Sequence, residues 1–162
     1  MSVETVLAGI EAWPLSVAIT ESTWLFPTIE TLHVLAIVLV VGSIFQLDLR
    51  LLGVSQRNRG VMQLADETLP WTWVAFVVAV ITGVLMFISA ATRYWGLTPF
   101  RVKMVLLLLA GLNMAIFHIT VYRAVHDWNH RLPTPVGARV AGTLSLTFWI
   151  GVVFFGRWIG FV

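Results

Sequence analysis

The chain has 162 residues, of which 59% are hydrophobic and 11% are charged, and its mean hydropathy is +0.90. A soluble domain of this length needs a larger polar surface, so this composition excludes a soluble globular protein and predicts one embedded in lipid. The formal charge of +2 is too small to indicate nucleic-acid binding, and the absence of cysteine excludes disulfides, thiolate metal sites and cysteine nucleophiles.

The first twenty residues differ from the rest because two glutamates, Glu4 and Glu11, interrupt their apolar pattern. Pro14 divides this stretch. No basic segment precedes the apolar residues, so the stretch does not resemble a cleaved signal peptide. Apolar residues at three- and four-residue steps predict a short helix that lies in the membrane interface over residues 1–20. They are Val6, Leu7, Ile10 and Trp13.

Four later segments are long and apolar enough to cross the hydrocarbon, which takes about 20 residues in a helix. They are residues 25–45, 71–91, 102–122 and 140–162. The sequence therefore predicts an all-α membrane protein, with residues 1–162 forming one domain, a bundle of four transmembrane helices. Residues 46–70, 92–101 and 123–139 are the predicted connections.

The distribution of arginine and lysine predicts the orientation in the membrane, because cytoplasmic connections carry an excess of both. The first and third connections carry Arg50, Arg57, Arg59, Arg123, Arg131 and Arg139. The opposite side carries Arg93, Arg101, Lys103 and Arg157. This excess favours a multi-pass protein of the cytoplasmic membrane with both termini outside.

The first span, "ETLHVLAIVLVVG", carries an ionisable pair, Glu30 and His33. A charged residue at the centre of a span costs roughly 2.5–3.5 kcal/mol on insertion scales, so such residues are typically functional. Glu30 lies three residues before His33 and therefore on the same helix face, where a carboxylate can orient a metal-ligating imidazole. The alternative is that His33 stays neutral and binds a neighbouring helix while Glu30 is hydrated.

The third span places Lys103, Ala110, Met114 and Phe117 within one sector of the helix, with His118 at its edge. Such a stripe is expected to face the interior of the bundle. The alternative is that Lys103 reaches the interface as an anchor and that Met114 only fills space.

Depth separates the two histidines, although both are candidate ligands. His33 lies slightly outward of the centre of its span, and His118 lies well inward of the centre of its own. At 1.5 Å per residue the offset is on the order of 13 Å. Two axial ligands of one haem need to lie at a similar depth in the membrane. The two histidines could therefore belong to two separate sites, or the second ligand of one haem could lie elsewhere.

The cations on the side of His33 predict an anionic partner, because little acid accompanies them. Arg101, Lys103 and Arg157 suit the propionates of a haem. Lipid phosphate is the alternative.

Two motifs, "TLHVLAIVLVVG" and "FRVKMVLLLLAGLN", resemble the membrane domain of copper resistance protein D and the related haem-dependent membrane protoporphyrinogen oxidases. In both families a Leu-His pair opens an apolar run, and a lysine opens a later leucine-rich span. The resemblance implies a b-type haem bound through His33, with Lys103 as a cation on the haem or substrate side. Val40 and Val41 stand where those families often carry a tryptophan, which argues against protoporphyrinogen oxidation.

These observations lead to one main hypothesis, a haem b-binding membrane protein that transfers electrons or acts as a membrane oxidoreductase. His33 is the expected axial ligand, oriented by Glu30, and His118 is the best second ligand. A redox protein or a quinone is the expected partner, and the chain is expected to form a homo-oligomer or part of a complex. The alternatives are Cu(I) handling by His33, Met114 and His118, and a structural subunit of a larger complex.

Overall fold

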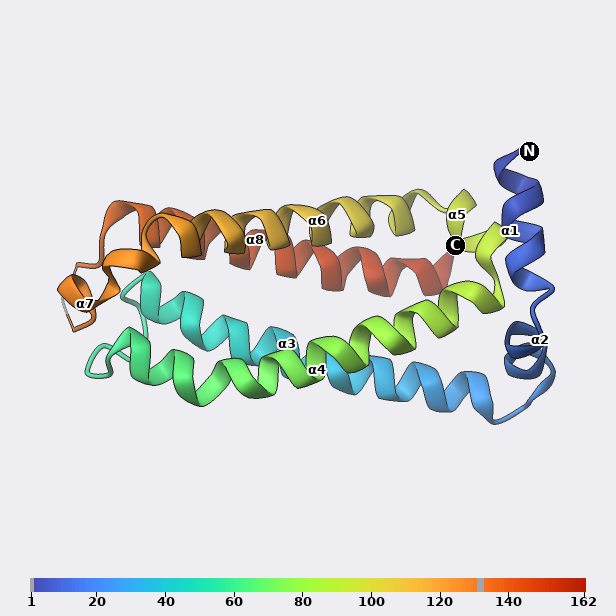
Figure 1. Cartoon of the computed structure of the whole chain (residues 1–162), viewed down its shortest axis with the longest axis horizontal. Coiled ribbons are helices and arrows are strands. Elements are labelled where there is room, and N and C mark those ends of the chain that lie inside the picture. Colours follow the sequence, from blue (N-terminus) through green and yellow to red (C-terminus); the bar gives the residue numbers. More distant parts are fainter. Residues whose placement is uncertain (1, 131–132) are drawn as a thin grey trace.

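The computed structural model describes residues 2–130 and 133–162, and within these ranges it contains helices and no strands. Four long helices run side by side along the molecule (Figure 1): α3 (Leu25–Leu51), α4 (Val61–Ser89), α6 (Thr98–Ile119) and α8 (Val136–Trp158). The shorter ones are α1 (Val3–Glu11), α2 (Pro14–Glu21), α5 (Ala91–Gly96), η1 (Tyr122–Ala124), α7 (Val125–Trp128) and η2 (Ile159–Phe161). The predicted all-α bundle of four long helices is confirmed.

The two ends of the bundle differ, and we name them by what they carry. The terminal end carries α1, α2, α5 and the C-terminus (Figure 1). The loop end carries the connection between α3 and α4 and the short helix α7. Both termini lie at the same end, as an even number of spans requires.

The helices are long and apolar enough for a multi-pass membrane protein. Four of them meet the requirements of a membrane span, and a fifth exists only if α1 and α2 count as one span bent by 64°. Pro14 is the first residue of α2, a position where proline is well tolerated. The short N-terminal helix predicted from the sequence is therefore two helices that meet at this proline.

Two of the helices extend beyond the predicted spans. Helix α3 continues past residue 45 to Leu51, and α4 begins at Val61 and passes through Pro70, which lies within the predicted connection. The reason is packing: Val61 and Leu64 are each only 1% exposed. Charged residues end an apolar window in the sequence, but here they lie on helical turns whose other face is buried.

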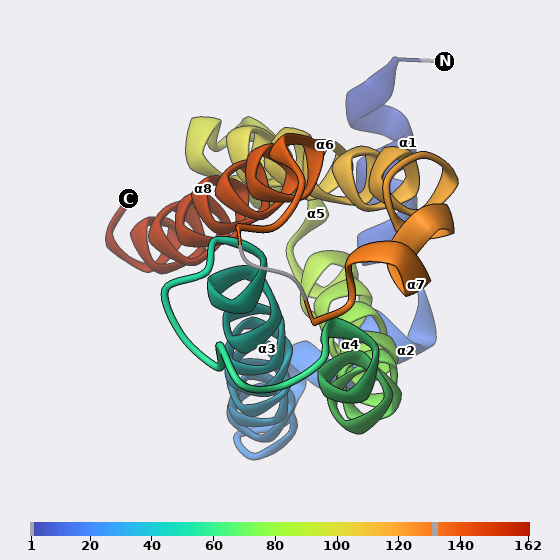
Figure 2. The same ribbon diagram turned by 90° about the vertical axis from the view of Figure 1, so that its left-hand side faces the viewer.

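The four helices form two pairs, α3 with α4 and α6 with α8, and α8 packs against α3 to join them (Figure 2). At Gly142 of α8 an added Cβ would lie 3.3 Å from the Asp48 carbonyl oxygen. A small residue thus lets two backbones approach closely, as is usual between helices in membranes. An apolar cluster that includes Val40, Ala110 and Trp149 fills the middle of the bundle.

Candidate functional site

His33 is half-buried on α3 and turns toward α4, where its Nδ1 lies 3.0 Å from Thr82 Oγ1. Thr82 is itself buried, and its hydroxyl donates to the Val78 carbonyl at 2.7 Å within its own helix. A hydroxyl has one hydrogen, so in the tautomer that keeps the Thr82–Val78 bond, His33 Nδ1–H donates to the Thr82 oxygen. In that tautomer the lone pair of the neutral imidazole lies on Nε2.

The ring of His33 packs against a glycine on α4. An added Cβ at Gly83 would lie 3.1 Å from His33 Cε1, which is tighter than an ordinary contact. The sequence pair Thr82-Gly83 therefore supplies both the hydrogen-bond acceptor and the space for the ring. No hydrogen-bond partner for His33 Nε2 occurs among the described residues.

Lys103, the single lysine of the chain, lies on α6 at the terminal end and is half-buried. Its ammonium is within electrostatic reach of the His33 ring. Its Nζ packs on Gly156 of α8, where an added Cβ would lie 3.5 Å away. The charge of a lysine on the second pair of helices thus acts on a histidine of the first pair.

Glu30 does not orient His33. Its side chain is exposed, and it makes no hydrogen bond with the ring among those found in the described residues. A separation of three residues put both side chains on one face of α3, but the ring turns to Thr82 on the neighbouring helix. A buried hydroxyl therefore takes the place that the sequence assigned to a carboxylate.

His118 and Met114 lie on an exposed part of α6, away from His33. His118 Nδ1 lies 2.9 Å from the carbonyl oxygen of Met114, and its ring contacts Tyr122. Lys103 and His118 are fifteen residues apart on one helix, which at 1.5 Å per residue is about 22 Å. The structure therefore does not bring His118 to His33.

The two arginines expected beside Lys103 lie on the surface. Arg101 is two residues from Lys103, so the two side chains cannot share a helix face, and it donates to Thr98. Arg157 is exposed and stacks over the ring of Phe161 at 4.7 Å. Of the three predicted cations, Lys103 is the one that reaches the interior.

The model of DUF6644, a family of unknown function, matches residues 21–162. The chain belongs to this family. No curated protein and no solved structure matches it. The matched range holds all four long helices, including His33, Thr82 and Lys103, whereas α1 lies outside it.

The loop end of this DUF6644 protein holds a second buried ionisable group that the sequence analysis did not single out. Arg50 is 0% exposed, and it donates from Nε to the Arg59 carbonyl at 2.8 Å and from Nη2 to the Asn129 carbonyl at 3.1 Å. Asp48 is also buried and faces Ser145 of α8. The alternation in "QLDLRL" was the available signal, because charged residues that alternate with leucine belong to a partly buried helix end.

The chemistry of the donors decides which group the site near His33 can hold. Among residues 2–130 and 133–162, no three His, Asp or Glu side chains gather as a metal site. A haem needs less from a protein, since its porphyrin supplies four nitrogen ligands. The site near His33 offers one imidazole held by a hydrogen bond and one lysine whose charge acts on it.

Proposed function

We propose that this DUF6644 protein binds haem b in the membrane, with His33 Nε2 as an axial ligand. The observation that carries the proposal is the hydrogen bond between His33 Nδ1 and Thr82 Oγ1. Ligand histidines in metal sites are held in this way through their second nitrogen, which fixes both the tautomer and the ring. A histidine with a purely structural role has no need to keep Nε2 free.

Lys103 supports the same proposal from the opposite pair of helices. Its ammonium has no carboxylate partner among the described residues, and it lies near His33. A haem propionate would neutralise it through a charge-assisted hydrogen bond. The haem would supply one-electron redox chemistry, and His33, Thr82 and Lys103 would hold and orient it.

The proposal extends to the cellular setting on the basis of charge and apolar length. The chain resides in the cytoplasmic membrane with both termini outside, and it exchanges electrons with a quinone or a redox protein. His118 serves this haem less well than the sequence analysis assumed, because it lies at the other end of α6. The second axial position then falls to another group or stays open.

Cu(I) handling finds less support in the geometry. The proposed path needs His33, Met114 and His118 to line one route. Met114 is 42% exposed, and His118 bonds back to its own helix. We therefore retain copper only as an outcome of the experiment below.

The test is a visible absorption spectrum of the full-length protein purified from haem-replete cells, oxidised and then reduced. We expect the spectrum of a b-type haem, and we expect His33→Ala to lose the haem or to convert it to the high-spin state. His126→Ala and His130→Ala serve as controls, because both side chains are exposed at the loop end. Equal haem content in His33→Ala and the parent would refute the proposal, as would a protein that binds copper and no haem.

Lys103→Gln adds a second readout that does not depend on haem content. Removal of a nearby positive charge favours ferric iron, so the midpoint potential should fall by an amount on the order of tens of millivolts. Arg123→Gln, an exposed arginine at the loop end, should leave the potential unchanged because water and salt screen it. Equal shifts of the midpoint potential in both variants would contradict the assignment of Lys103 to the site.

A further inference from the structure

A polar depression opens at the loop end, beside the last turn of α3 and the start of α8. Its volume is about 400 Å³, and its lining contains Gly53, Arg57, Thr134 and Arg139 together with Leu52 and Pro133. No carboxylate lines it. Its two charged side chains are both arginines, so its electrostatic preference is for an anion.

The two arginines are prepared for a ligand from outside the chain. Neither forms an ion pair with a carboxylate in the part of the chain that the structure describes. Arg57 Nε donates to the Gly53 carbonyl at 2.5 Å, which fixes the side chain and leaves its terminal amino groups free. Arg59 differs, because it pairs with Glu67. Planar guanidinium groups suit phosphate oxygens particularly well.

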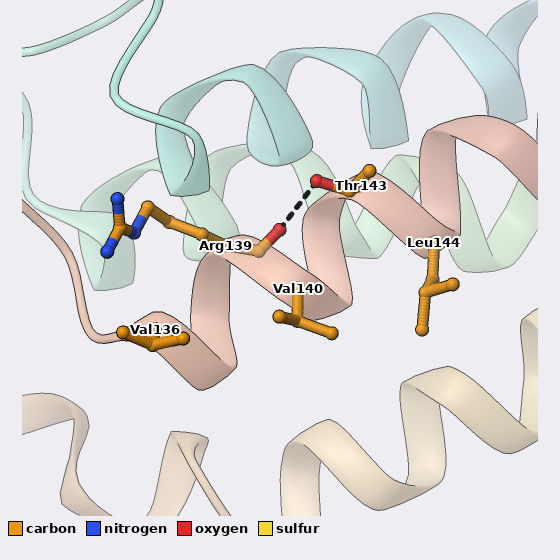
Figure 3. A pocket seen from close by; sticks show the side chains of 5 residues that line it. All are labelled: Val136, Arg139, Val140, Thr143 and Leu144. Carbon is orange, nitrogen blue, oxygen red and sulfur yellow. Dashed lines mark hydrogen bonds between the residues drawn. The ribbon is translucent and has the colours of Figure 1, made fainter.

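An apolar groove of about 430 Å³ lies along α8, and Figure 3 shows the residues that line it. One of them, Arg139, also lines the depression. Val136, Val140 and Leu144 follow one another at four-residue steps and form its exposed apolar stripe along α8. The one hydroxyl in the groove, that of Thr143, donates to the Arg139 carbonyl at 2.9 Å. The groove therefore presents hydrocarbon, and it runs along a helix long and apolar enough to cross the membrane.

We infer that the depression and the groove together bind one anionic phospholipid, with its phosphate between Arg57 and Arg139 and one acyl chain along the stripe on α8. Charge selects an anionic headgroup over a neutral one. The apolar stripe on α8 favours a lipid over a free phosphate, because a free phosphate has no acyl chain to bury in the groove. The position agrees with the depth of headgroups, since α8 begins at this end, and basic pockets between membrane helices bind such lipids. This site is separate from the proposed haem site at the terminal end.

The experiment measures lipid binding to the full-length protein in a neutral detergent by native mass spectrometry, with thermal unfolding in parallel. The probes are phosphatidylglycerol, phosphatidylcholine and inorganic phosphate. We expect phosphatidylglycerol alone to bind and to raise Tm. Equal binding of phosphatidylcholine would overturn the choice by charge, and equal stabilisation by inorganic phosphate would overturn the assignment to a lipid.

The paired variant Arg57→Gln/Arg139→Gln locates the site. Loss of the charged hydrogen bonds should weaken phosphatidylglycerol binding about tenfold or more. Arg123→Gln is the matched control, since this arginine is exposed at the same end and lines neither cavity. Both altered arginines are exposed, so the fold should persist, and circular dichroism checks this. Unchanged affinity in a folded double variant, or an equal loss in the control, would refute the site.

Discussion

Helix α3 carries two basic side chains that contact other segments, Arg50 at the loop end and His33 in the half nearer the terminal end. Arg50 donates to two backbone carbonyls from different segments, and it is completely buried. His33 is held from one neighbouring helix, by a hydrogen bond between its Nδ1 and Thr82. The comparison teaches that Arg50 joins several segments and is structural, whereas His33 joins only two helices and remains a candidate ligand.

The surroundings of the two residues follow the same division. Around Arg50, the Asn129 side chain accepts from the Met62 amide at 2.8 Å, and Thr134 donates to the Leu51 carbonyl at 2.5 Å. Around His33 and Lys103 the neighbours include two glycines, Gly83 and Gly156, together with Thr82. The loop end is therefore held by polar contacts between segments, although Asp48 Oδ2 and Arg50 Nη1 are buried there without a hydrogen-bond partner in the described structure. The terminal end has fewer polar contacts between segments around its ionisable groups.

The largest effect should come from Arg50→Ala, which tests whether this arginine is structural. It leaves the part-buried Arg59 carbonyl without its donor, removes one of the two donors to the Asn129 carbonyl, and creates a cavity. We therefore expect a loss of about 3 kcal/mol in the free energy of unfolding. Reversible unfolding in mixed micelles measures the loss. Arg57→Ala, at an exposed site on the following loop, should cost far less. Similar losses of unfolding free energy in both variants would contradict the structural role of Arg50.

Thr82→Val tests the opposite side of the comparison, because valine keeps the shape of threonine without its oxygen. If Thr82 orients a ligand, haem affinity should fall by about 10- to 100-fold, while stability should change little. Thr72→Val is the matched control, since Thr72 is buried on the same helix and donates only to the Thr68 carbonyl. A haem titration of both variants measures the two affinities. Equal haem affinities would contradict the role of Thr82 in orienting His33.

Ser16→Ala sharpens the description of the terminal end. The Ser16 hydroxyl donates to the Ile88 carbonyl at 2.8 Å and attaches α2 to the end of α4. Its loss should cost about 1 kcal/mol and should speed amide hydrogen exchange in α1 and α2. Glu11 still accepts from the Thr92 amide at 2.8 Å, so the attachment should weaken without being lost. Exchange in α8 is the internal reference, and an equal change there would indicate global destabilisation.

The smallest effect concerns alkaline pH and Tyr94 on α5. Burial raises the pKa of its phenol, with Glu30 acting in the same direction and Arg93 opposing both. A raised pKa in the folded state means that this stability is complete below the unfolded value of about 10 and is lost as pH rises through the folded pKa. Tyr94→Phe should therefore flatten the fall of Tm above about pH 10. A fall that persists unchanged in the variant would contradict the assignment.

The sequence was sufficient for the class of fold, because four apolar segments of spanning length have few alternatives in lipid. Their ends were harder to predict. Hydropathy treats Asp48, Arg50 and Glu67 as breaks, whereas a helix continues through charged residues when its other face is packed. Pro70 likewise lies inside α4, although proline usually ends a helix.

The candidate site was only partly accessible from sequence for a similar reason. His33 and Lys103 stood out because ionisable residues are rare in spans, and the structure brings them near each other. Thr82 and Gly83 did not stand out, since threonine and glycine are common in membrane helices. Which helix faces which is a tertiary property, so periodicity within one helix assigned Glu30 as a partner that the packing did not supply.

The arrangement in two helix pairs has a consequence for biogenesis. Helices α3 and α4 are consecutive long helices, as are α6 and α8, so each pair can associate as soon as its second member has left the ribosome. Docking of α8 on α3 requires all four long helices. His33 belongs to the early pair and Lys103 to the late one, so their approach is completed only at that step. A cofactor that needs both residues would then be acquired after the fourth long helix has been made, rather than by the first pair alone.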